Sequence, residues 1–292
     1  MPDMVDPFAR SIEWTLQRRD SVATVRFEPV TKEPSEYLDH HMSFAAALEE
    51  VRFDDSIRVV VITGGDEIFE LGSRREGATP VPSHLLDLGV RGGGSGAIRG
   101  PWSLTQGLER AFVTLALMEK PVVGRLSGDA YGFSLHLLWG CDIVVAREDV
   151  IVNDPHLAMD PGLPWAMAAG DGAFAFLSLY LTPTKLKEFI MLGPRWTGRQ
   201  LADLFLVNYA VPARELDSKV DEILNALLDR PPGPLIRTKR AINKRLIEQM
   251  NLTFDYSWSA QAIDLWELSA TGFVQDFTLR PDQPNWSLGP ET

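Results

Sequence analysis

Histidine is the residue type in this sequence best suited to acid–base chemistry near neutral pH. An imidazole has an unperturbed pKa of about 6.5, so at pH 7 the neutral ring can take a proton from water. The chain contains five histidines, which are His40, His41, His84, His136 and His156. His156 is a candidate for a general base, and the preceding Pro155 restricts its local backbone.

A histidine base needs a partner that orients the ring through its second nitrogen. Asp171, within Gly170-Asp171-Gly172, is the predicted partner, while Asp154 and Asp160 are alternatives nearer in the sequence. The opposing interpretation makes His156 a polar loop residue and Asp171 a turn former. We predict a His156–Asp171 dyad that activates water.

His136 lies in an apolar run and has two interpretations. If it faces the site, it can hydrogen-bond a substrate carbonyl or protonate an enolate. If it faces the core, it is a buried histidine whose polar atoms are satisfied. His84 is expected in a solvent-exposed loop, and the neighbouring His40 and His41 point to different sides of a helix. No metal site is predicted.

Residues 120–172 contain the elements that would position these side chains. The sequence predicts a short buried strand at Val122 and Val123, a buried helix at residues 135–139 and a strand at residues 143–146. Glycines between the first two elements mark a tight turn where the backbone approaches a ligand. This arrangement points backbone N–H groups and a helix dipole at an anion or a developing oxyanion.

Apolar periodicity predicts the elements in the rest of the chain. Strands are predicted on both sides of a turn at Arg19-Asp20 and at residues 58–63 and 207–211. Helices are predicted at residues 37–51, 104–117, 174–181, 185–192, 216–228, 235–249 and 254–269. Residues 76–101 are rich in glycine, proline and serine, and we expect them to form a lid rather than an idle surface loop.

Length and composition are typical of one large globular domain with an appended helical part. The chain has 292 residues, of which 45% are hydrophobic. We divide it into a core over residues 12–200, a helical region over residues 201–276 and an extended or disordered tail over residues 277–292. The sequence has no run of 18 apolar residues, so no membrane span is predicted.

The charge and cysteine content restrict the partners and the location. A net charge of −12 argues against nucleic acid and acidic membranes, and it fits poorly with a polyanionic CoA ester. The single cysteine, Cys141, excludes an internal disulfide, favours a reducing cytoplasm and is expected to be inert packing. The N-terminal segment carries acidic residues before any apolar run, unlike a signal peptide.

The central segment resembles the crotonase superfamily, the enoyl-CoA hydratase and isomerase fold. The resemblance is carried by Lys120-Pro121, Gly128, Gly132 and Cys141-Asp142-Ile143, and it extends over roughly residues 14–270. It implies an α/β crotonase fold, in which a spiral core of ββα repeats is followed by C-terminal helices that build trimers. A homotrimer or hexamer is therefore expected.

The resemblance also implies an oxyanion hole formed by the backbone N–H groups of Ser73 and Phe133. Hydratases of this family carry two catalytic glutamates, and His136 and His156 stand at those positions here. Arg74 replaces an acidic residue that usually follows the first donor. These replacements argue against ordinary enoyl-CoA hydration.

The site pattern is most similar to one side branch, the β-diketone hydrolases typified by 6-oxocamphor hydrolase. Pro155-His156 and Gly170-Asp171-Gly172 match the branch's His–Asp dyad, although their separation is longer here. That branch also has a histidine on its first helix, eighteen residues before the first valine of a Val-Val strand. Here His41 stands eighteen residues before Val59. The implied activity is retro-Claisen hydrolysis of a small hydrophobic β-diketone without a cofactor, with His156, Asp171, His41 and His136 as catalytic residues.

Two other functions are left open by the sequence. A CoA-thioester hydratase, lyase or hydrolase can use the same oxyanion hole with a histidine base, and Arg74, Arg75 and Lys239 are then candidate phosphate partners. A catalytically silent subunit would act through its trimer surface. Turnover of diketones or of CoA esters separates these functions.

Overall fold

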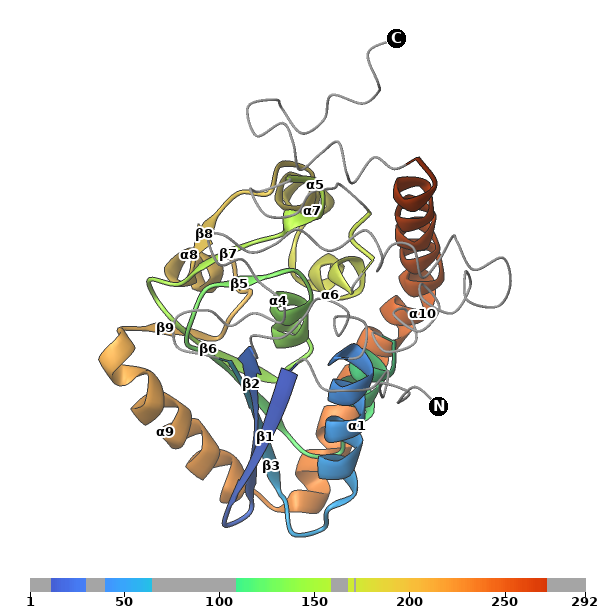
Figure 1. Cartoon of the computed structure of the whole chain (residues 1–292). Helices are drawn as coiled ribbons and strands as arrows, with labels where there is room; N and C mark the ends of the chain where they lie inside the picture. Colours follow the sequence, from blue (N-terminus) through green and yellow to red (C-terminus); the bar gives the residue numbers. More distant parts are fainter. Residues whose placement is uncertain (1–11, 30–39, 65–108, 159–167, 171, 272–292) are drawn as a thin grey trace, which may run out of the picture.

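The computed structural model describes residues 12–29, 40–64, 109–158, 168–170 and 172–271. Within these ranges the main sheet has six strands in the order β1-β2-β3-β4-β6-β9, and a smaller sheet has the order β5-β7-β8 (Figure 1). The strands of the main sheet are β1 (Ile12–Arg19), β2 (Val22–Pro29), β3 (Val59–Thr63), β4 (Val122–Leu126), β6 (Ile143–Arg147) and β9 (Tyr209–Val211). Those of the smaller sheet are β5 (Ala130–Tyr131), β7 (Ile151–Asn153) and β8 (Trp196–Thr197).

Helices surround the two sheets. Residues 109–117 are helical, and the labelled helices are α1 (His40–Phe53), α4 (Gly132–Trp139), α5 (Pro155–Ala158), α6 (Ala173–Tyr180), α7 (Pro183–Leu192), α8 (Gly198–Asp203), η2 (Ala213–Glu215), α9 (Leu216–Leu228) and α10 (Pro232–Thr271). The hairpin of β1 and β2 is antiparallel, and β2, β3, β4, β6 and β9 are paired in parallel. The predicted α/β fold with a C-terminal helical region is thereby confirmed.

The central parallel strands β3 and β4 bury both of their faces, as parallel sheets covered by helices do. Val60 and Ile62 of β3 belong to a large hydrophobic cluster that includes residues of α1, α4 and α6. Val59 and Val61, which alternate with them, pack in a second cluster with α9. Figure 1 shows α9 on one side of the main sheet and α1 and α10 on the other side. The near-continuous valine run of β3 follows from this two-sided burial.

One prediction about the helices is wrong. Residues 235–249 and 254–269 were expected to form two helices, but both lie within α10, which spans 40 residues. No proline or glycine stands between the two predicted segments, so nothing in the sequence ends the first helix there. The prolines at 232 and 234 fall in the first turn of α10, where a missing N–H breaks no intrahelical hydrogen bond.

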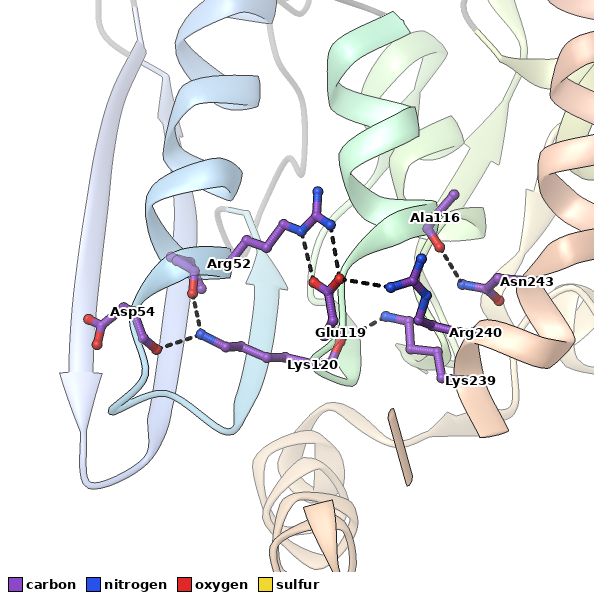
Figure 2. Close-up of polar contacts among 9 residues, drawn as sticks. Arg52, Asp54, Ala116, Glu119, Lys120, Lys239, Arg240 and Asn243 are labelled. Atoms are coloured by element: carbon purple, nitrogen blue, oxygen red, sulfur yellow. Dashed lines mark hydrogen bonds and ion pairs between the residues drawn. The ribbon is translucent and has the colours of Figure 1, made fainter. Parts of the chain in front are cut away.

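Polar contacts fix the first half of α10 to the core (Figure 2). Lys239 is buried and donates a hydrogen bond of 2.8 Å to the carbonyl oxygen of Lys120. Arg240 lies 3.3 Å from Glu119, which Arg52 of α1 also binds through hydrogen bonds of 2.8 and 2.9 Å. The hydrogen bonds to Glu119 raise the pKa of Arg52, while burial acts in the opposite direction. α10 is therefore joined to α1 through the segment that precedes β4.

The domain division stays a prediction, although residues after position 200 also contribute to the sheet. β9 pairs with β6, and α9 covers the strands beside it. The predicted lid at residues 76–101 and the predicted tail at residues 277–292 lie outside the described residues.

Among the helices described, none combines the length and the apolar character required to cross a membrane.

Candidate active site

Asp154 lies at the centre of the candidate site because two short elements meet there. It follows β7 directly and precedes α5, which begins at Pro155. β7 pairs with β5, and β5 leads straight into α4. This pairing brings His136 of α4 and His156 of α5 to the same carboxylate. The Asp154 side chain is fully buried.

The carboxylate of Asp154 contacts two imidazoles, one with each oxygen. Its Oδ1 lies 2.9 Å from Nδ1 of His156, and the backbone N–H of His156 donates to the same oxygen over 3.0 Å. Its Oδ2 lies 3.0 Å from Nε2 of His136. The two imidazoles are nearly parallel, with ring centroids 6.2 Å apart and an interplanar angle of 11°. Asp154 therefore bridges the two histidines.

The two histidines also determine the charge of Asp154. Burial by itself would raise the pKa of this carboxyl group, because an ion is poorly solvated in the interior. Attraction to His156, together with hydrogen bonds from both imidazoles and attraction to His136, outweighs burial and lowers the pKa well below its usual range. Asp154 is therefore an ionised acceptor at neutral pH.

This contact assigns different tasks to the two nitrogens of His156. A carboxylate accepts hydrogen bonds, so the neutral ring carries its proton on Nδ1, facing Asp154. Nε2 then holds the lone pair that can accept a proton, and it lies 3.5 Å from the Nε2 amide nitrogen of Gln261. His156 is 6% exposed, which leaves a small accessible area on an otherwise buried base. The arrangement can take a proton from water.

His136 is more deeply buried than His156. Its side chain has no exposed surface, and its ring stacks on Trp139 with centroids 5.3 Å apart. Of the two interpretations offered by the sequence, this geometry matches a buried histidine with a polar partner. It does not match a ring that opens onto solvent. His136 can support the site by holding the second oxygen of Asp154.

The remaining predicted site residues are described in part or not at all. Asp171 and Ser73 lie outside the described residues, as do Arg74 and Arg75. The Nδ1 contact of His156, for which Asp171 was predicted, is made in the structure by Asp154, the alternative nearer in the sequence. Asp160, the other alternative, also lies outside the described residues.

The backbone positions of Phe133 and His41 are described. Phe133 is the second residue of α4, and His41 is the second residue of α1. The first four N–H groups of a helix have no acceptor within that helix, so the N–H of Phe133 is suited to bind an oxyanion. Its role in an oxyanion hole stays a prediction, as does the catalytic role of His41.

Two residues of the site environment were missed by the sequence reasoning. Gln261 of α10 reaches Nε2 of His156, although 105 residues separate them. No local pattern signals such a contact. Trp139 was expected either to be packing or to line an apolar pocket, and its stacking contact with His136 was not predicted.

The structure also describes the environments of Lys239 and Cys141, both of which the sequence analysis singled out. Lys239, a candidate phosphate partner, lies 2.7 Å from Asp142 with its side chain 6% exposed. Burial raises the pKa of Asp142, while attraction to Lys239 acts in the opposite direction. Cys141 is buried, and burial also raises the pKa of its thiol. This matches the expected inert role, because the reactive form of cysteine is the thiolate.

Comparison with known proteins places this geometry in context. No protein-family model matches the sequence. The chain is 26% identical over 200 residues to YngF of Bacillus subtilis, which is provisionally named an enoyl-CoA hydratase/isomerase; the match covers 68% of this chain and 69% of that protein.

Solved structures match nearly the whole chain. A crystal structure of an enoyl-CoA hydratase/isomerase from Mycobacterium paratuberculosis superposes with a TM-score of 0.71 at 19% identity, covering 92% of this chain and 100% of the other. A β-diketone hydrolase from the cyanobacterium Anabaena, bound to (S)-3-oxocyclohexyl acetic acid, gives a TM-score of 0.69 at 19% identity, with 91% and 99% covered. The chain therefore has the crotonase fold, which proteins of both names share.

Proposed function

We propose that this chain is an enzyme of the crotonase superfamily that hydrolyses a carbon–carbon bond of a β-diketone. The observation that carries the proposal is the contact between Asp154 and Nδ1 of His156, which leaves the lone pair of the neutral ring on Nε2. A buried carboxylate that orients an imidazole is the arrangement enzymes use to activate a hydroxyl group or water. The likeness to the β-diketone hydrolase from Anabaena supports the choice of substrate class.

The reaction starts when His156 Nε2 takes a proton from water. The water oxygen forms a bond to one carbonyl carbon, and the carbonyl electrons move onto oxygen as an oxyanion. The oxyanion collapses, the bond to the central carbon breaks, and its electron pair leaves as an enolate. The proton held by His156 returns to the enolate carbon or its oxygen. The sum is one diketone plus one water giving one keto acid when the diketone is cyclic.

The backbone N–H groups of Ser73 and Phe133 are the proposed donors to the oxyanion. Phe133 lies in the first turn of α4, where the helix dipole adds partial positive charge. One such donor typically contributes about 3 kcal/mol to the transition state. His41 is proposed to bind the second carbonyl. His136 acts through Asp154, because its ring is fully buried.

A CoA-thioester hydratase, lyase or hydrolase is the alternative function. The named sequence relatives favour it, since YngF is provisionally named for enoyl-CoA chemistry. The replacement of both hydratase glutamates by histidine opposes ordinary hydration. A histidine base can also hydrolyse a thioester, so the substrate decides between the two functions.

The deciding experiment is an assay of the purified protein on cyclic β-diketones and, in parallel, on acyl- and enoyl-CoA esters. We expect ring opening of a diketone, and its loss in His156→Ala. Asn225→Ala, at an exposed position of α9, is the control and should retain the activity. Turnover of a CoA ester alone, with none of a diketone, would refute the proposal.

We also propose a small hydrophobic diketone as substrate, a homotrimer or hexamer as the assembly and a cytoplasmic location. Apolar side chains exposed on α10 support self-association, and they include Ile242, Leu252, Tyr256 and Ile263. Ile242, Tyr256 and Ile263 are separated by multiples of seven residues, the repeat with which helices pack along one seam. The partner that fits this surface is a second copy of the chain.

A further inference from the structure

Gln261 links α10 to the candidate base. Its carboxamide nitrogen lies 3.5 Å from His156 Nε2, the ring atom on the side opposite the Asp154 contact. Gln261 is only 5% exposed, so the protein interior holds its side chain. We propose that Gln261 is a positioning residue that keeps His156 in the neutral, Nδ1-protonated form and locates the water that His156 deprotonates. This inference rests on the proposed function.

Packing against Gly170 restricts the side chain of Gln261. A Cβ atom at position 170 would lie 2.4 Å from Gln261 Oε1 and 2.7 Å from its Cβ, so the absence of a side chain there makes room for Gln261. One turn further along α10, Asp264 accepts a hydrogen bond of 2.6 Å from the backbone N–H of Ala168. These two contacts hold the segment before Gly170 against α10. They place the carboxamide of Gln261 next to the imidazole.

An amide donor and a carboxylate would affect this imidazole in opposite ways. The N–H of a carboxamide can donate to Nε2 only while Nε2 is unprotonated, so it stabilises the neutral ring that acts as a base. A distance of 3.5 Å is at the outer limit of a hydrogen bond. Nε2 has one lone pair, and the two groups are too close for a water molecule to lie between them, so water reaches Nε2 when the carboxamide turns aside. That water can accept from the amide and donate to Nε2, which directs its lone pair toward a carbonyl carbon.

In the part of the chain that the structure describes, the charged groups near His156 already have partners. Asp154 contacts Nδ1 of His156, and its second oxygen is held by His136. Asp264 of α10 binds the backbone of Ala168. On α7, which packs against α5, Lys185 and Glu188 pair with each other at 2.9 Å. A charge introduced at position 261 would therefore act on His156 at short range.

The test is the titration of His156 in the intact protein, followed by NMR of ¹⁵N-labelled histidine, together with the pH profile of kcat/KM. The His156 signal is assigned by its loss in His156→Ala. Gln261→Glu keeps the size of the side chain and places an acceptor beside Nε2. Gln249→Glu is the matched control, because it makes the same change on the same helix more than three turns away.

We expect Gln261→Glu to raise the pKa of His156 by about one unit or more, since the carboxylate stabilises the imidazolium. The acid limb of kcat/KM should move to higher pH by the same amount. Gln261→Met, which removes the amide, should lower kcat about tenfold with KM within about twofold. Gln249→Glu should change neither quantity.

Titration of His156 at the same pH in Gln261→Glu and in the wild type would overturn the inference. The NMR measurement needs no substrate, so it separates this inference from the proposed function. A shifted titration in a protein that leaves every diketone intact would support the positioning of His156 by Gln261 and refute the diketone reaction.

Discussion

His136 and Asp154 are both fully buried, and the Nε2 atom of His136 lies 3.0 Å from Oδ2 of Asp154. The other oxygen of the same carboxylate contacts His156. A buried carboxylate is costly unless hydrogen bonds and opposite charge compensate for lost hydration. Here two imidazoles provide that compensation. Asp154 therefore connects an inner, inaccessible histidine to the outer histidine that can reach water.

We predict that Asp154→Asn will reduce kcat by at least about 100-fold while the fold is retained. An asparagine side chain has a similar shape but no charge, so it stabilises neither the imidazolium nor the Nδ1-protonated form of His156. Steady-state kinetics on the diketone identified for the wild type measure the loss, and circular dichroism checks the fold. Asp149→Asn is the control, because Asp149 is exposed and pairs with Arg147 at the surface. Wild-type kcat in Asp154→Asn would contradict the role of this carboxylate.

We also predict a pH dependence of stability that originates in Asp154. The pKa of this carboxyl is lowered in the folded protein, so its contribution to stability is fully present above the unfolded value of about 3.9. The contribution is lost as the pH falls from there toward the folded pKa, by up to about 1.4 kcal/mol per pH unit for one proton. Urea unfolding between pH 3 and pH 7 measures it.

Asp154→Asn provides the comparison for that titration. The difference in unfolding free energy between wild type and variant should shrink as the pH falls below about 4. A difference that stays constant down to pH 3 would show that Asp154 does not have the lowered pKa that its two histidine partners imply.

The sequence predicted the parallel strands and most helices because their patterns are local. The valine run of β3 and the Thr182-Pro183 start of α7 are examples, and Thr182 does accept a hydrogen bond from the backbone N–H of Lys185. β7 and α5 contain three and four residues, too few for a period to be visible. Because these two short elements were not predicted, the sequence offered Asp154 only as an alternative partner of His156.

The site depends on contacts that no local pattern encodes. Gln261 and His156 meet only because α10 continues unbroken past position 253 and passes the segment that contains Gly170. The resemblance to a known family predicted that His136 and His156 stand at the positions of the hydratase glutamates. It did not indicate that both bind one carboxylate, since that arrangement follows from the pairing of β5 with β7.

Lys239→Met should destabilise the protein by about 1–3 kcal/mol, because the half-buried carboxyl of Asp142 loses its cationic partner at 2.7 Å. Chemical denaturation measures the change. Arg240→Ala is the neighbouring control: Arg240 is 53% exposed, and Glu119 keeps its contact with Arg52, so we expect about 0–1 kcal/mol. Equal effects of the two substitutions would contradict the larger contribution to stability that we predict for the contact between Lys239 and Asp142.

The exposed apolar side chains of α10 should hold copies of the chain together. Leu252, Tyr256 and Ile263 are 70%, 79% and 55% exposed, and their spacing places them on one face of the helix. Tyr256→Ser combined with Ile263→Ser removes apolar surface from this face without touching the core, so the oligomer should dissociate at concentrations where the wild type remains associated. Sedimentation velocity over a concentration series measures the change in assembly.

Asp255→Ser, at an exposed position beside these apolar residues, should leave the assembly unchanged. A wild-type chain that sediments as a monomer at every concentration would contradict the proposed assembly, and an unchanged oligomer in the double variant would place the interface elsewhere on the surface.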